Sequence, residues 1–485
     1  MPGPYGRAAC PAPKGPRYNH TVTPVPLDLP LRPSEAGELA ILIFEQAERK
    51  PLNDEVRNRL AARGAALRLE TVAPYFGSLV RDPVHPSSYY LAVDGGRGEP
   101  LLLHLAPAAA PTSSIFYKPL LIGRMRRPNG PEIVVNAVPF GPSDHENLEK
   151  FVSQIGAAFL PRPQGVRPAI AVSSALPAAF DAFRAILKHT GKNLAATAAN
   201  PSASGRDFYY AGLSAAIRAG WREGYSAGIQ LVVGAGHVAC VPHARPLQET
   251  IRNAAGFTRF STDTSALLNG AAVEDRAWIL DEFVRPFEIG DAVYEFTSPD
   301  VLRLASKFGA ALKVNEQLHE SIRQARSVLK TGRSFDFEPS LDGSATITTP
   351  QELVFWLHWL KARGHAAQLA APNLVPRTSD LALSSSGRAC PAPTLGEGPR
   401  GRPLARAPLG DGVAGRLKEF AAISRHYQCT LSICSGAGHS AETLEAIARA
   451  TVGRVNYRLS PELRLPPEDS DYSRYIVWLA EHLVT

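Results

Sequence analysis

The chain has 485 residues, more than a single ordinary hydrophobic core accommodates, which predicts a large domain with a smaller domain or extensions. Hydrophobic residues make up 45% and charged residues 20%, values typical of a soluble globular protein that exclude a disordered or fibrous chain. The net charge of +7 is concentrated partly in an N-terminal tail and in residues 388–406, which indicates solvated basic segments rather than a nucleic-acid-binding face.

The five cysteines show no CxxC spacing and are odd in number, so neither a disulfide framework nor a zinc ribbon is indicated. No apolar run approaches the length of a membrane span, and residues 1–17 lack the apolar centre of a signal peptide. We therefore expect a cytoplasmic protein that contacts neither membrane nor nucleic acid. Its basic balance suits an acidic small molecule such as a sugar acid.

Three regions follow one another along the chain. Residues 1–35 are rich in proline and predict a tail, and residues 36–165 predict an N-terminal α+β region. That region contains expected helices at 39–49 and 145–159 and expected strands at 101–105 and 132–138. Residues 166–485 form the third region, and within it residues 376–412 predict a disordered insertion rich in Pro, Gly, Ser and Arg.

Strand-like and helix-like patterns alternate through the third region. The expected strands are 169–172, 194–198, 229–233, 258–262, 335–341, 367–371, 430–434 and 454–459. The expected helices are 177–188, 207–223, 244–255, 274–286 with 299–330, 350–363, 413–426, 440–450 and 471–483. Eight such units, with no hairpin turn pairs between them, predict an α/β fold: a (β/α)₈ TIM-like barrel with an N-terminal α+β extension. A doubly wound parallel sheet is the alternative, since a sequence does not reveal strand order.

Active sites of such barrels lie at the carboxyl ends of the strands. The tetrapeptide Gly-Ala-Gly-His occurs there twice, at 234–237 and 436–439, after the third and seventh strands. Because these strands are opposite in an eight-stranded barrel, His237 and His439 could bind a divalent metal together with Cys434 and a carboxylate. The alternative is that both tetrapeptides are glycine turns.

Two aspartates directly follow apolar strands. Asp263 and Asp342 are the candidate catalytic residues, because a carboxylate at a strand end can act as a general base, as a metal ligand or as the N-cap of the next element. Ser435, Gly436 and Ser440 belong to the loop between the seventh strand and its helix. They are the candidate substrate-binding residues, because the amino end of a helix offers free N–H donors to an anion.

Three segments carry a resemblance to a known family: SFDFEPSLD at 334–342 with Thr348-Thr349-Pro350, FTRFSTDTS at 257–265, and the seventh strand with its Ser-Gly loop. They resemble the tagaturonate epimerase family, over residues 130–485. The resemblance implies a sugar-acid (hexuronate) epimerase that interconverts tagaturonate and fructuronate by inverting C4 with a divalent metal cation. A small-molecule sugar acid is the partner that it implies.

The chain departs from this family at the positions that carry the chemistry. Gly343 stands where the family motif has an acid/base glutamate, and Cys434 and Asn456 stand where it has metal-binding histidines. Gln230-Leu231 replaces an Asp-His pair, whereas Asp263 and Asp342 match. Three hypotheses follow: an epimerase with a relocated metal site, a catalytically degenerate barrel that binds a carbohydrate, an anion or a partner, and an unrelated barrel enzyme whose 436–440 loop holds a phosphate.

Overall fold

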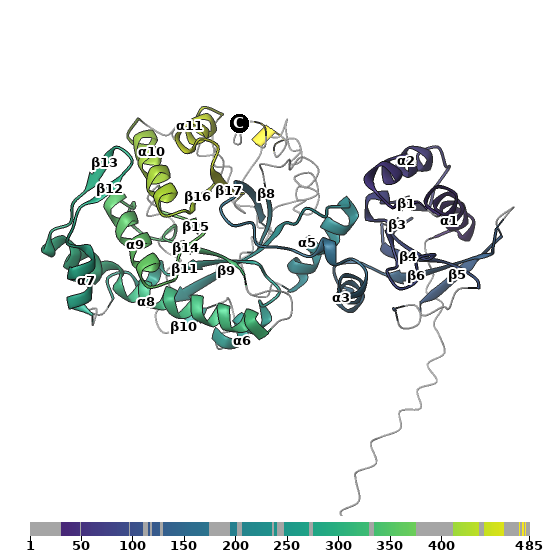
Figure 1. Cartoon of the computed structure of the whole chain (residues 1–485), viewed down its shortest axis with the longest axis horizontal. Coiled ribbons are helices and arrows are strands. Elements are labelled where there is room, and N and C mark those ends of the chain that lie inside the picture. Colours follow the sequence, from purple (N-terminus) through teal and green to yellow (C-terminus); the bar gives the residue numbers. More distant parts are fainter. Residues whose placement is uncertain are drawn as a thin grey trace, which may run out of the picture.

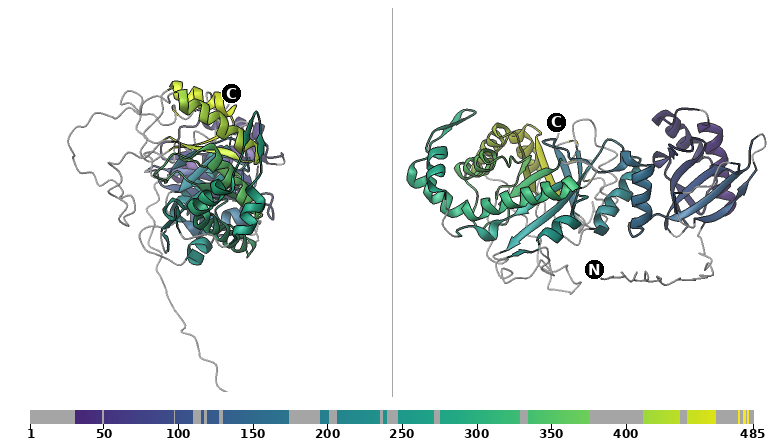
Figure 2. Two further views of the ribbon diagram at one scale, coloured as in Figure 1. Left: turned by 90° about the vertical axis from the view of Figure 1, so that its left-hand side faces the viewer. Right: turned by 60° about the horizontal axis from the view of Figure 1, so that its bottom comes forward.

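The computed structural model describes residues 31–48, 50–96, 98–109, 115–116, 119–126, 130–173, 195–200, 206–234, 237–239, 247–270, 275–328, 334–374, 411–435 and 441–459, with residues 475, 478, 479 and 481. Figure 1 shows two units, an N-terminal sheet with its helices and a larger barrel, and both appear again in the two views of Figure 2. Within the described part of the chain, no helix combines the length and the apolar character needed to cross a membrane.

The N-terminal unit is an antiparallel sheet in the order β1-β3-β4-β6-β5, with β2 also paired to β3. Its strands are β1 (Val72–Pro74), β2 (Val80–Arg81), β3 (Tyr89–Gly95), β4 (Pro100–Pro107), β5 (Leu120–Met125) and β6 (Ile133–Pro139). Successive side chains point to opposite faces of a strand, and in this sheet both faces are covered. Helix α1 (Pro33–Ala47) packs on one face with α2 (Asp54–Gly64), and α3 (His145–Gln154) packs on the other. The first helix begins at Pro33, two residues before the predicted end of the tail.

Eight parallel strands form the second sheet, in the spatial order β14-β11-β9-β8-β7-β17-β16-β15. They are β7 (Ala169–Ser173), β8 (Ala195–Asn200), β9 (Ser226–Gly234), β11 (Arg259–Asp263), β14 (Asp336–Ser340), β15 (Leu369–Ala370), β16 (Thr430–Cys434) and β17 (Val455–Leu459). The two ends of this order meet, because Ser340 of β14 forms a parallel bridge with Ala371 and the Leu341 N–H donates to the Ala371 carbonyl at 2.8 Å. The sheet is therefore nearly closed into a barrel, and all eight predicted strands are present.

Helices surround these strands in Figure 1. They are α5 (Arg206–Ala219), α6 (Leu247–Asn253), α7 (Arg276–Phe283), α8 (Ser298–Val328), α9 (Pro350–Ala362), α10 (Asp411–His426) and α11 (Ala441–Thr451), and three single turns of 3₁₀ helix lie at Phe76–Ser78, Ala157–Phe159 and Ser265–Leu267. The expected helix at 177–188 lies outside the described residues, as do residues 376–410 of the predicted insertion and most of the expected helix at 471–483. The eight parallel strands are thus established, whereas the full (β/α)₈ pattern is not, because some of the expected helices lie outside the described residues.

Two hairpins contradict the expectation that none would occur in this region. Strand β10 (His237–Ala239) runs antiparallel to β9, with Gly234 paired to His237, and β12 (Phe287–Ile289) pairs with β13 (Ala292–Tyr294). The first hairpin supports the glycine-turn interpretation of the 234–237 tetrapeptide, because the backbone of His237 returns along β9 instead of entering a strand-to-helix loop.

Candidate active site at the barrel mouth

The interior of the barrel is lined by charged and polar side chains at alternate strand positions. Phe260, Phe337 and Tyr457 belong to the apolar cluster outside the strands, so their neighbours in sequence face inward. The inward-facing residues that concern the site are Arg259, Ser261, Asp263, Glu338, Ser340, Ser432, Cys434, Asn456 and Arg458. Interiors of such barrels are usually filled by Val, Ile and Leu, so this composition marks the interior as a site rather than as packing alone.

The middle layer of the interior is a buried ion pair with a hydrogen-bonded amide. The Arg259 Nε donates to Glu338 Oε2 at 2.7 Å, and its Nη1 donates to Asn456 Oδ1 at 2.9 Å. The Asn456 Nδ2 in turn donates to Ser432 Oγ at 2.7 Å. Arg259, Glu338 and Asn456 are at most 4% exposed, so strands β11, β14, β16 and β17 are linked through the barrel interior.

Arg458 connects this layer to the barrel mouth. Its Nη1 lies 3.6 Å from Glu338 Oε1, and its Nη2 donates to Asp342 Oδ2 at 2.8 Å. Burial opposes ionisation of Glu338, but the guanidiniums of Arg259 and Arg458 outweigh it and hold the pKa of this carboxyl below its ordinary value. For Arg458, too, burial disfavours the charge, while Glu338 and Asp342 raise the pKa of the guanidinium. Glu338 and Arg458 are therefore both ionised.

The two predicted catalytic aspartates lie at this end of the barrel. Asp342 is bound to Arg458 and its side chain is 34% exposed. The Asp263 Oδ1 accepts a hydrogen bond from the Ser265 N–H at 3.0 Å, an Asx-type turn before the 3₁₀ turn Ser265–Leu267, whose N-cap residue is Thr264 rather than Asp263. Its Oδ2 lies only 2.5 Å from where a Cβ on Gly343 would stand, so the Asp263 carboxylate fills the place of a side chain at 343. Both carboxylates thus belong to one region, on either side of Gly343.

The predicted residues of the seventh-strand loop are only partly described. Cys434 ends β16 in register with Arg458 of β17, at the mouth. Ser435 is fully buried, and its N–H donates to the Arg458 carbonyl at 2.8 Å. Gly436, His439 and Ser440 lie outside the described residues, and for His237 the structure describes the backbone alone. Of the three predicted metal ligands, Cys434 is therefore the one whose side chain can be placed.

Three buried polar atoms of the interior have no hydrogen-bond partner among the described residues: Ser261 Oγ, Glu338 Oε1 and Arg458 Nε. Buried polar groups in native proteins are nearly always paired with protein, water or a ligand. Ser261 and Glu338 are neighbours in register and Glu338 lies beside Arg458, so these atoms, a hydroxyl, an acceptor and a donor, belong to neighbouring residues of the interior. Such a set suits a small hydroxylated or anionic molecule, or ordered water.

A divalent metal does not fit the described residues at the positions where the family resemblance expects ligands. The oxygen and nitrogen of the Asn456 amide are both engaged, Leu231 is fully buried in the apolar cluster outside the strands, and two guanidiniums already supply positive charge to the interior. Within the described residues, one group of three ligand side chains has its ligand atoms within 4.8 Å of one another, namely His319, Glu320 and His365. That group does not lie at the mouth.

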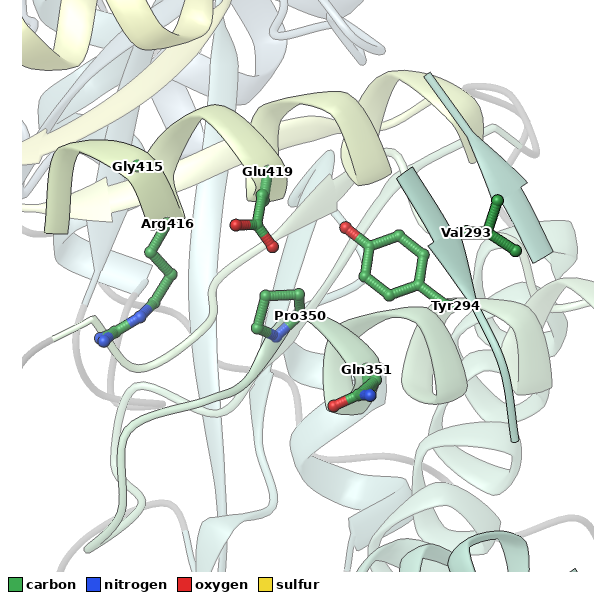
Figure 3. Close-up of a pocket in the computed structure, with 7 residues that line it drawn as sticks. All are labelled: Val293, Tyr294, Pro350, Gln351, Gly415, Arg416 and Glu419. Atoms are coloured by element: carbon green, nitrogen blue, oxygen red, sulfur yellow. The ribbon is translucent and has the colours of Figure 1, made fainter. Parts of the chain in front are cut away.

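A cleft of about 500 Å³ lies on the outer ring of helices rather than inside the barrel. Figure 3 shows its lining, which comes from the β12–β13 hairpin, the start of α9 and the start of α10. The lining residues are Val293, Tyr294, Pro350, Gln351, Gly415, Arg416 and Glu419. It contains none of the predicted site residues.

This architecture has counterparts among solved structures. The chain is similar to fructuronate-tagaturonate epimerase UxaE from Cohnella laeviribosi, in its form with one glycerol bound, with a TM-score of 0.56 and 17% sequence identity over 84% of this chain and 74% of that one. The form with two glycerols gives the same values, and the native form gives a TM-score of 0.55 over 83% and 74% of the two chains. Neither the protein-family models nor the curated proteins that were compared with the sequence match it. The chain therefore has the fold of this epimerase, and the predicted resemblance is confirmed at the level of the fold.

Arg259, Glu338 and Arg458 were not among the residues predicted to form the site. Glu338 and Arg458 are charged residues with apolar neighbours on both sides, as in Phe337-Glu338-Pro339, and Arg259 is the first residue of its strand, between Thr258 and Phe260. A charged residue in a strand that is buried on both faces must have an oppositely charged or hydrogen-bonding partner. This requirement is the signal in the sequence that could have identified the three residues.

Proposed function

We propose that this protein is an isomerase of the epimerase type that acts on a sugar acid of the hexuronate class at the barrel mouth. The observation that carries the proposal is the convergence of the Asp263 and Asp342 carboxylates with the Arg458 guanidinium at the carboxyl ends of β11, β14 and β17. The fold similarity to a fructuronate-tagaturonate epimerase supports the same class.

The residues of the mouth suit the steps that an epimerisation requires. Epimerising a sugar carbon needs groups that take a proton from the substrate and return it. Asp263 and Asp342 are partly exposed carboxylates that can accept and return a proton, and they come from two adjacent strands. Arg458 is a fixed cation beside them, and a guanidinium recognises a carboxylate by paired hydrogen bonds. In this proposal Arg458 binds and orients the carboxylate of the substrate, while Asp263 and Asp342 accept and return its proton.

A second candidate function is binding of a sugar acid without turnover. It is favoured by the contacts of Gly343 and Asn456, which replace a catalytic glutamate and a ligand histidine of the resembling family. Both positions take part in the contacts of this structure. The Asp263 carboxylate occupies the space beside Gly343, and Asn456 links Arg259 to Ser432. In this version the barrel keeps its anion-binding mouth and has lost the epimerase chemistry.

One set of measurements separates the two functions. Binding of fructuronate and tagaturonate to the purified full-length protein is measured by calorimetry, and their interconversion is followed by NMR with and without Mn²⁺, Zn²⁺ or Ni²⁺. The epimerase proposal predicts turnover that falls at least 100-fold in Asp263→Asn and Asp342→Asn. Binding without turnover under every metal condition supports the second function. No binding of either sugar acid overturns both, and binding of inorganic phosphate instead supports the phosphate-loop alternative.

Elemental analysis of the same preparation addresses the metal. A cation at the mouth would need Cys434 with the His237 and His439 imidazoles. Retained activity in the Cys434→Ala, His439→Ala double variant would therefore exclude that ligand set while leaving the epimerase proposal standing.

A further inference from the structure

A second group of ligand-type side chains lies at the opposite end of the barrel from the mouth. His319 and Glu320 are on the last third of α8, and His365 stands between α9 and β15. One ligand atom from each lies within 4.8 Å of the others, and His365 Nε2 is 3.2 Å from Glu320 Oε1. The rings of His319 and His365 meet edge to face with their centroids 5.0 Å apart.

The backbone under this group is fixed by regular structure. Helix α9 ends at Ala362, and Gly364, just beyond its C-cap Arg363, has a φ of +80°, the left-handed conformation that glycine adopts most readily. The His365 N–H then donates to the Leu360 carbonyl at 2.7 Å, which completes the helix C-terminal motif and sets the position of His365. His319 is held from the other side, because its ring packs against Phe335 and Phe337.

The ring nitrogens of the group are incompletely satisfied. The Nδ1 atoms of His319 and His365 are buried and have no hydrogen-bond partner among the described residues. A ring nitrogen without a hydrogen-bond partner can offer its lone pair to a cation. The Arg323 guanidinium donates to Glu320 Oε2, which leaves Oε1 on the side of His365.

We propose that His319, Glu320 and His365 form a structural site for a divalent transition metal of the zinc class, which ties α8 to the start of β15. Two imidazoles and one carboxylate are a common protein ligand set for Zn²⁺, with water as the fourth ligand. Ligand atoms around tetrahedral zinc are about 3.3 Å apart, a separation that the His365–Glu320 pair already has. The site is independent of the proposed function, because it lies at the other end of the barrel and shares no residue with the mouth.

The test is titration of the metal-free full-length protein, purified without a polyhistidine tag, with Co²⁺ and Zn²⁺. We expect one Co²⁺ per chain with the visible absorption of a four-coordinate site, its displacement by Zn²⁺, and a Zn²⁺-dependent rise in Tm. His365→Gln and His319→Gln are expected to weaken binding at least 10-fold and to abolish the rise. Glu320→Gln does the same without risk to the fold, because this side chain is 48% exposed.

Two controls separate this site from others. His426→Gln removes an exposed histidine elsewhere on the surface, and Cys434→Ala removes the predicted ligand at the mouth, so neither changes the cobalt spectrum. The proposal is overturned if Co²⁺ does not bind, if the spectrum survives in Glu320→Gln and His365→Gln, or if it is lost in Cys434→Ala alone.

Discussion

The Asp263 carboxylate lies directly beside Gly343 at the mouth. A side chain at 343 would meet the Asp263 carboxylate, and the resembling family has a glutamate at that position. Here the Asp263 carboxylate occupies the same space, but it comes from β11 and not from position 343, which follows β14. The backbone of Gly343 does not lie in the left-handed region, so the contact with Asp263 is the reason that the space excludes a side chain.

Gly343→Ala is expected to lower the free energy of unfolding by about 1–2 kcal/mol, because the new methyl must displace the carboxylate and its hydrogen bond to Ser265. The measurement is urea unfolding followed by circular dichroism. In an Asp263→Ala background the same substitution should cost less, since the carboxylate is gone, and the difference is the coupling between the two residues.

Gly415→Ala is the matched control. Gly415 lies within helix α10 and a Cβ there meets no atom within 4 Å, so this change should be neutral or slightly stabilising. If Gly343→Ala lowers the free energy of unfolding equally in the wild-type protein and in Asp263→Ala, the proposed contact is refuted.

At the scale of elements, three strands are held to one another through the inside of the barrel. Arg259 of β11, Glu338 of β14 and Asn456 of β17 form one hydrogen-bonded group, although β11 and β17 are not neighbours in the sheet. Buried ion pairs add little net stability compared with apolar packing, but removing one partner leaves an uncompensated charge. The main effect of the network is therefore to specify which strands face each other, and its net contribution to the free energy of unfolding is small.

Glu338→Leu should destabilise the protein by about 3–5 kcal/mol, because Arg259 and Arg458 then lose their shared buried counter-ion. The double variant Arg259→Met, Glu338→Leu should recover part of that loss. Both are measured by chemical unfolding, with the double-mutant coupling as the readout.

The exposed pair of Arg59 and Glu55 provides the comparison. Their side chains are 44% and 75% exposed, so Arg59→Met should change stability by less than about 1 kcal/mol. A loss in Glu338→Leu as small as that in Arg59→Met would show that the interior network carries no structural role.

At the scale of the whole molecule, local patterns in the sequence predict elements but not the pairings between them. The eight strands were predicted because each is a short apolar run followed by a helical period. The start of α9 is equally local, since Thr349 and Glu352 form a capping box there. The contact of Arg259 with Asn456 joins residues 197 positions apart, and no local pattern encodes such a partner. The hairpin after β9 was not predicted, because the glycines that follow this strand are equally typical of a strand-to-helix loop.

The N-terminal unit and the barrel share a hydrophobic core. Tyr210, Leu213 and Ile217 of α5 pack against the same face of the N-terminal sheet as Leu102 and Phe140. The opposite side of α5 faces the barrel, where Ala215 and Ala216 belong to the barrel cluster. Arg222 adds polar links, with Nη2 donating to the Gly77 carbonyl at 2.8 Å. One helix thus serves both units, which predicts that they unfold together.

Leu102→Ala tests that cooperativity, because all five tryptophans follow residue 220 and their fluorescence reports only on the barrel. Leu102 is 1% exposed on the shared face, and its truncation should cost about 2–5 kcal/mol. If the units unfold as one, the tryptophan transition moves to lower denaturant by the same free energy as the far-ultraviolet circular dichroism transition. Leu357→Ala, a substitution inside the barrel core, calibrates the fluorescence response. A tryptophan midpoint that stays at its original value in Leu102→Ala, while hydrogen exchange of β3 and β4 accelerates, would show that α5 does not couple the two units.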